Sequence, residues 1–267
     1  MSPRVPAVLF AALVTVILLA RLGGAPVPPV PPAPPSTEVA APLPAASPVR
    51  TRPRVEQLPG VTGAPSGTPT MDLEATLAVR RRILREGDRV YLDSLLATTD
   101  STLVRWRDRT RQPLRVYFVV DTGMPGWSPD AVVVAVAGMS RWSGNAAGVG
   151  LERTDDSARA DITVRFVSAV IADSTYGVTE LNWDGDGTAH RATIRLAMQQ
   201  TDSGPPLPRE VRARVAAHEF GHALGLPHSG SFRDLMYRTA RIEGPSRRDQ
   251  ATLQLLYAVP PGPLRTP

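Results

Sequence analysis

Three of the four histidines of this 267-residue chain lie close together, between His218 and His228. Residues 208–224 are typical of a helix, and side chains four positions apart on a helix share one face, so His218 and His222 can bind one metal ion. His228 supplies a third ligand, because Gly225 lets the chain turn sharply after the helix. Three imidazoles that leave one position open are the ligand set of a catalytic zinc site.

Glu219 follows the first of these histidines and is turned toward the open side of the metal, where a carboxylate can accept a proton from water. A purely structural zinc site has no need of such a base, so the pattern favours hydrolysis. The alternative is a set of core histidines satisfied by hydrogen bonds. That alternative explains one such residue and not three at this spacing.

The residues around this motif carry a family resemblance. The motif at residues 218–228 and the Leu-Met-Tyr triplet at residues 235–237 resemble the metzincin zinc peptidases, and Ser229 directly after the third histidine is similar to their matrixin branch. Arg238 departs from the family, in which a proline usually follows the tyrosine. The resemblance covers about residues 104–259, through motifs at its C-terminal end and through the order of elements before it.

The resemblance implies an α+β fold of the metzincin type. Its catalytic domain has a twisted, mostly parallel sheet with an edge antiparallel strand, a ligand helix under the cleft and a C-terminal helix. It also implies that zinc is the cofactor and that Glu219 is the general base of peptide hydrolysis. Met236 takes the Met-turn role beneath the three imidazoles, and Tyr237 helps to shape the substrate pocket.

The elements that must position these residues follow from periodicity and capping signals. Alternating apolar residues predict strands, and cap residues predict helix starts. We predict strands at 113–120, 161–166 and 192–197. We predict helices at 70–89, 132–142 and 208–224. Ser246 and Asp249 have the spacing of a capping box ahead of the C-terminal helix.

By the resemblance, the strand at 192–197 is the edge strand beside the cleft. An extended peptide can add to such an edge through main-chain hydrogen bonds. Ile194 and Leu196 are then candidate substrate-binding residues. The alternative is an edge strand that binds no ligand.

Asn182, Asp184 and Asp186 place oxygen atoms at alternate positions before a glycine, as in the first half of a calcium-binding loop. Thr193 stands where such a loop has its last acidic ligand, so a glycine-rich hairpin turn is favoured and calcium is the alternative. Matrixins often carry a second, structural zinc that uses several histidines. His190 is the single histidine left for it, so we expect none.

The chain divides into four regions. Residues 1–25 hold the apolar run Val5–Ala20 behind a basic start, which indicates a signal peptide or an N-terminal membrane anchor and therefore export. Residues 26–69 contain 14 prolines and form a semi-rigid linker. Residues 70–103 are a helical linker or a pro-segment, and residues 104–267 are the peptidase domain.

Composition excludes several function classes. The chain has no cysteine, which rules out disulfides, Cys-ligated zinc and a thiolate latch on the metal. The formal charge of +5 lies in residues 1–112, with 14 Arg and 9 acidic residues, whereas residues 113–267 have 16 of each. A neutral folded region argues against nucleic-acid binding.

These observations predict a zinc endopeptidase that is secreted or membrane-anchored outside the cytoplasm. It acts on a protein or peptide substrate, and we expect a monomer. The alternative is an exported zinc-containing binding or adhesion module without peptidase activity.

Overall fold

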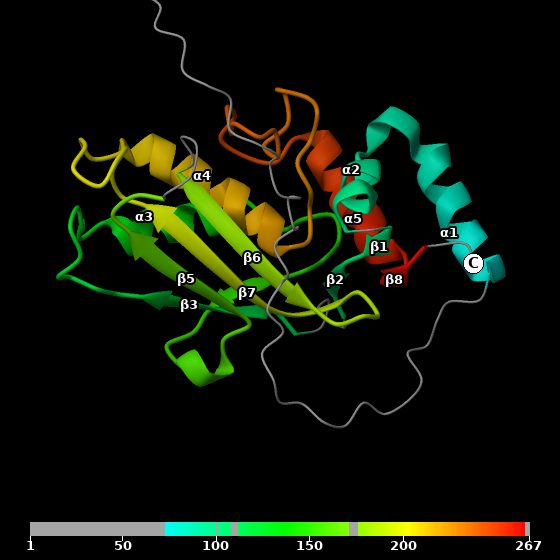
Figure 1. Ribbon diagram of the computed structural model, residues 1–267, viewed down its shortest axis with the longest axis horizontal. Helices are drawn as coiled ribbons and strands as arrows, with labels where there is room; N and C mark the ends of the chain where they lie inside the picture. The colour runs from blue at the N-terminus through cyan, green and yellow to red at the C-terminus, as the bar shows by residue number, and fades with distance from the viewer. Residues whose placement is uncertain (1–72, 100, 108–111, 171–175, 265–267) are drawn as a thin grey trace, which may run out of the picture. The chain divides into compact units, whose positions relative to one another are not determined.

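The computed structural model describes residues 73–99, 101–107, 112–170 and 176–264 (Figure 1). These residues all belong to one compact unit, Thr62–Pro267. The predictions for the signal or anchor segment, the Pro-rich linker and residues 70–72 lie outside the described residues. Within the described part of the chain, no helix is both long and apolar enough to span a bilayer.

The centre of the fold is a mostly parallel sheet. Strands β3, β5 and β7 pair in parallel, β4 extends the sheet beyond β3, and β2 pairs with the start of β7. Strand β6 pairs with β7 in antiparallel register. The strands are β2 (Arg105–Trp106), β3 (Leu114–Val119), β4 (Leu151–Arg153), β5 (Ile162–Val167), β6 (Gly177–Trp183) and β7 (Thr188–Ala197), with a 3-10 turn, η2 (Ser157–Arg159), before β5. The α+β fold with an antiparallel edge strand is therefore confirmed.

The edge position, however, belongs to β6 and not to the strand predicted for it. Residues 192–197 lie in β7, which pairs with β5 on one side and with β6 on the other. Its main-chain groups are thus already used in the sheet, and no peptide can add there. Periodicity could not reveal this, because the alternation Ala-Thr-Ile-Arg-Leu is typical of an edge strand and of an inner strand alike.

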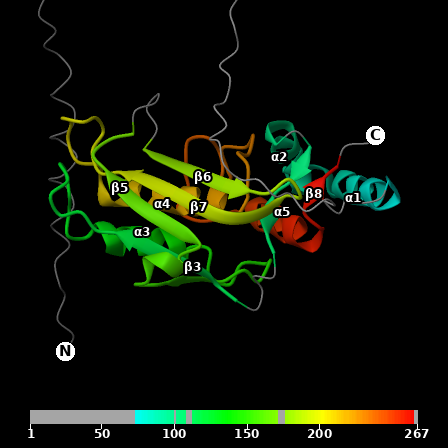
Figure 2. The same cartoon turned by 60° about the horizontal axis from the view of Figure 1, so that its bottom comes forward.

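Two helices pack beside the sheet. Helices α3 (Ala131–Ser140) and α4 (Arg209–Ala223) lie against each other, and α4 also contacts β6 and β7 (Figures 1 and 2). At the α3–α4 crossing, a Cβ on Gly138 would lie 2.6 Å from Ala216 Cβ. The glycine therefore permits a close helix contact, which fixes α4 against the sheet.

The remaining helices form a second apolar core with the C-terminal strand. Its buried residues come from the segment before the sheet and from the end of the chain, and include Ile83, Leu92, Leu255 and Leu256. The elements are α1 (Leu73–Glu86), η1 (Gly87–Arg89), α2 (Leu92–Thr98), β1 (Thr102–Leu103), α5 (Arg247–Ala258) and β8 (Gly262–Pro263). The predicted helix at 70–89 is thus α1 followed by a 3-10 turn, and α2 was not predicted.

Candidate zinc site

Helix α4 presents the first two histidines from its buried C-terminal half. Every residue from Ala216 to Gly221 is buried. Two buried indoles hold this half of the helix: Trp106 Nε1 donates to the carbonyl of Ala223 at 2.8 Å and Trp142 Nε1 to that of Ala217 at 2.7 Å. Gly225 follows with a φ of 98°. This left-handed conformation favours glycine, and it turns the chain back toward the third histidine.

The three imidazoles converge through their Nε2 atoms. His222 Nε2 lies 3.1 Å from His218 Nε2 and 3.2 Å from His228 Nε2. One ligand atom from each ring lies within 4.8 Å of the others. Zinc bonds imidazole nitrogen at about 2.0–2.1 Å with tetrahedral angles, so neighbouring ligand nitrogens of about this separation fit the ion.

Hydrogen bonds on the far side of two rings fix which nitrogen faces the metal. His218 Nδ1 lies 2.7 Å from the carbonyl oxygen of Leu235, and His222 Nδ1 lies 2.8 Å from that of Leu226. Because a carbonyl can only accept, each Nδ1 carries the proton and each Nε2 offers its lone pair.

Burial lowers the pKa of His218 and of His222 to about 4, and it also lowers the pKa of His228. The three rings are therefore neutral at pH 7, which is the form that binds zinc.

Glu219 is buried beside the triad, and strand β6 holds its side chain. Thr179 Oγ1 donates a hydrogen bond to Glu219 Oε2 at 2.7 Å. A Cβ on Gly177 would lie 2.6 Å from Glu219 Cγ, so only glycine leaves room for the carboxylate there. Burial raises the pKa of Glu219. A carboxyl group with a raised pKa next to three candidate ligands is suited to taking up a proton.

Met236 is fully buried. A Cβ on Gly221, in the ligand helix, would collide with the Met236 side chain and with Trp142, so the helix and the turn are in direct contact. Ser229 N donates to the carbonyl of Met236 at 2.7 Å and thereby ties the turn to the residue after His228.

The family model described as Matrixin matches residues 208–258. The geometry of the histidine triad agrees with this match. Residues 208–258 therefore resemble the matrixin family. No curated protein matches the chain significantly. The match and the histidine triad support a zinc metallopeptidase in general terms.

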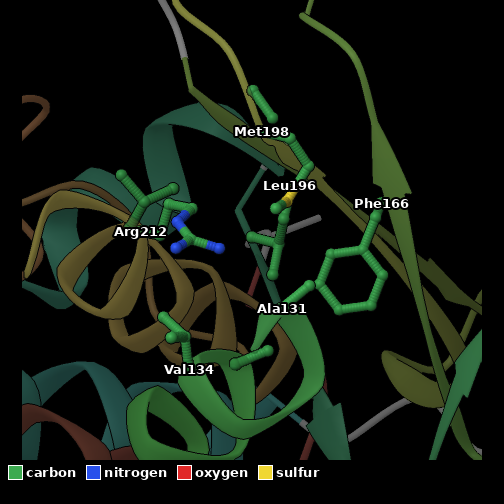
Figure 3. A pocket seen from close by; sticks show the side chains of 9 residues that line it. Ala131, Val134, Phe166, Leu196, Met198 and Arg212 are labelled. Atoms are coloured by element: carbon green, nitrogen blue, oxygen red, sulfur yellow. The ribbon is translucent and has the colours of Figure 1, made fainter. Parts of the chain in front are cut away.

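The weaker candidates for substrate binding are Ile194, Leu196 and Tyr237. Ile194 is fully buried in the main core. Leu196 points into an internal space between the sheet and helices α3 and α4, beside Phe166 and Met198 (Figure 3). Both side chains are therefore core residues of an inner strand. Tyr237 is half-buried after the Met-turn, with the Arg241 guanidinium 6.0 Å from its ring centre.

The residues proposed for calcium form the turn of the β6–β7 hairpin. Asp184 N and the carbonyl of Thr188 are paired at 3.0 Å, and Asp186 accepts from Thr188 N and from Arg107, each at 2.9 Å. Asn182 lies in β6 at an irregularity in its pairing with β7. The hairpin prediction is confirmed, and internal hydrogen bonds occupy the Asp186 carboxylate.

Sequence reasoning missed Thr179 and Gly177. They lie about 40 residues before the motif, in a strand that was not predicted. A glycine two positions from a threonine carries no signal by itself, and the contact exists only because β6 runs past α4.

Proposed function

We propose that the protein is an exported zinc endopeptidase in which Glu219 is the general base. The observation that carries this proposal is the convergence of three neutral imidazoles beside a buried carboxylate. His218, His222 and His228 would hold zinc, which when bound would supply Lewis-acid polarisation of the scissile carbonyl and of the attacking water. Glu219 accepts the proton of that water and returns it to the leaving amine.

The substrate in this proposal is a peptide in extended form along β6. Among the described strands, β6 pairs with β7 alone, and Thr179 and Gly177 place Glu219 directly beside it. A peptide that adds to this edge through main-chain hydrogen bonds runs past the carboxylate. The proposed molecule is a monomer and does not bind nucleic acid, in keeping with the neutral charge of residues 113–267.

The decisive experiment uses the purified full chain. We expect one zinc per chain, together with cleavage of an unstructured protein such as casein that a chelator abolishes. Glu219→Gln keeps the shape of the side chain and removes the base, so it should retain zinc and lose about 10²–10⁴-fold in rate. Zinc with no cleavage would favour the binding-module alternative, and absence of zinc would contradict the site itself.

Export rests on the apolar run Val5–Ala20 behind Arg4. Expression in a bacterial host followed by N-terminal sequencing of the mature protein tests it. A new N-terminus on protein outside the cytoplasm indicates a cleaved signal peptide, and an intact N-terminus in the membrane fraction indicates an anchor. Intact protein in the cytoplasm would contradict export.

A further inference from the structure

A buried carboxylate lies directly behind the Met-turn. Asp249, in the first turn of α5, is completely buried. Its Oδ2 accepts hydrogen bonds from Leu235 N at 2.8 Å and from Ser246 N at 2.7 Å. Its Oδ1 accepts from the hydroxyl of Tyr91 at 2.6 Å. Tyr91 comes from the segment between α1 and α2, so a side chain about 160 positions away in the sequence completes this group.

The backbone of a single residue, Leu235, connects Asp249 to the candidate zinc ligand His218. The N–H of Leu235 is bound by Asp249, and the carbonyl of Leu235 accepts the hydrogen bond from His218 Nδ1. Tyr91 and His218 are thus linked through hydrogen bonds to Asp249 and to the backbone of Leu235. Partners of this kind orient a metal-binding histidine, and their loss commonly weakens metal binding.

Arg248 makes a second connection between residues 73–99, the upstream segment, and the site. Its guanidinium donates to the carbonyl oxygens of Asp88 at 2.8 Å and Val90 at 3.1 Å. It also donates to Ser229 Oγ and to Asp234 Oδ2, both at 2.9 Å. Ser229 follows the third histidine directly. One arginine therefore holds the chain before Tyr91 against the loop after His228.

The upstream segment is buried as part of the same body. Tyr91 is 4% exposed, and its ring lies beneath the Arg248 guanidinium at 5.0 Å. Helix α1 is fastened along its second half, because Arg80 and Arg82 donate to the carbonyls of Leu264 and Ala258. Figures 1 and 2 both show α1 and α2 beside α5.

We propose that residues 73–99 are a permanent positioning element of the zinc site, in which Tyr91 acts through Asp249 and Leu235 on the ligand His218. The proposal rests on the proposed zinc site and adds a role for the upstream segment. A pro-segment that leaves on activation would expose the Asp249 carboxylate and remove one of its three donors. The segment instead completes the support of the Met-turn and is retained in the active protein.

The test measures zinc affinity in the full chain. The metal is removed with a chelator, and zinc is returned in competition with a chromophoric chelator at pH 7.5. Tyr91→Phe removes the hydroxyl and keeps the ring, so we expect about tenfold weaker zinc binding. Tyr117→Phe is the matched control, because Tyr117 lies in β3, which is separated from β6 by β5 and β7. The control should bind zinc as the wild type does.

Circular dichroism of each zinc-free variant shows whether it is folded at the assay temperature. A merely structural role of Tyr91 would lower stability and leave the zinc affinity of the folded protein unchanged. If Tyr91→Phe does not fold, Arg248→Lys takes its place and should weaken zinc binding in the same direction. A folded variant with wild-type zinc affinity overturns the positioning role. A wild type that binds zinc but cleaves nothing overturns the peptidase alone, and a wild type that binds no zinc overturns both.

Discussion

The proposed base is held from the strand and not from its own helix. Thr179 donates to the Glu219 carboxylate, and Gly177 leaves space for the side chain. A hydrogen bond to a charged group contributes about 1.5–3 kcal/mol, which corresponds to roughly 10- to 100-fold in rate if it serves to orient the base. Loss of the Thr179 hydroxyl should therefore lower the rate of peptide hydrolysis.

Thr179→Val keeps the shape of the side chain and should lower kcat by about 10- to 100-fold, with zinc content unchanged. Steady-state kinetics on a peptide substrate, with zinc analysis of the same samples, measures both quantities. Thr163→Val in β5 is the matched control, since Thr163 pairs with Tyr117 and Thr193 inside the sheet. Equal kcat values for the two variants would show that Thr179 does not orient the carboxylate.

The histidine triad makes the zinc-free protein sensitive to acid. Burial lowers the pKa of His218 from 6.5 to about 4. Between these values the unfolded chain takes up the proton and the folded chain does not, so stability present above pH 6.5 is lost as the pH falls toward 4. For His218 the loss is about 3 kcal/mol.

Urea unfolding of the zinc-free protein at a series of pH values checks this sign. His218→Asn should show a shallower decline between pH 6.5 and 4, because the proton-binding group is gone while other titrating groups remain. A decline as steep as that of the wild type would mean that His218 is not the group responsible.

At the residue scale, the sequence predicted the zinc ligands and the base, which lie close together in the chain. The ligands and the base fall within eleven residues of one helix and its turn, where spacing alone determines which side chains share a face. Thr179 and Tyr91 act from elements far away in the sequence. Their contribution depends on which strand or helix packs beside the motif, and spacing carries no information about that.

At the scale of elements, the capping box of α5 was predictable and is confirmed. Ser246 Oγ accepts from Asp249 N at 3.0 Å, and the Asp249 carboxylate accepts from Ser246 N. What the spacing could not show is that Asp249 also supports the Met-turn. The order of strands was likewise beyond the sequence, because pairing partners and not periodicity decide which strand is at the edge.

Ser246→Ala should therefore lower the free energy of unfolding by about 1–2 kcal/mol, the usual cost of losing an N-cap. The hydroxyl also donates to Asp234 Oδ1 at 2.7 Å, which places the expected value toward the upper end. Denaturant unfolding compares Ser246→Ala with the control Ser140→Ala. Ser140 lies at the exposed end of α3, and among its described contacts its hydroxyl donates only to the carbonyl of Val136. A Ser246→Ala loss no greater than that of Ser140→Ala would contradict the capping role.

At the scale of the whole molecule, the described chain has two apolar cores that share α5. One core contains the sheet, α3, α4 and the Met-turn, and the other joins α1 and α2 to α5 and the C-terminal strand. Tyr257 of α5 packs against both. The C-terminal helix thus connects the upstream segment to the helix that carries the zinc ligands.

This arrangement predicts that a chain beginning at residue 104 does not fold stably. Removing residues 1–103 removes six buried apolar side chains of the second core, Val79, Ile83, Val90, Leu92, Leu95 and Leu103. Each is worth about 1.5–3 kcal/mol of burial, so the loss is comparable with the entire stability of about 5–15 kcal/mol that a domain has. It also exposes Leu255 and Leu256, which invites aggregation. A chain lacking only residues 1–61 should unfold at the same temperature as the full chain, because it keeps every described residue of both cores. Thermal unfolding and size-exclusion chromatography compare the three chains, and a soluble, cooperatively unfolding chain from residue 104 would show that the first core stands alone.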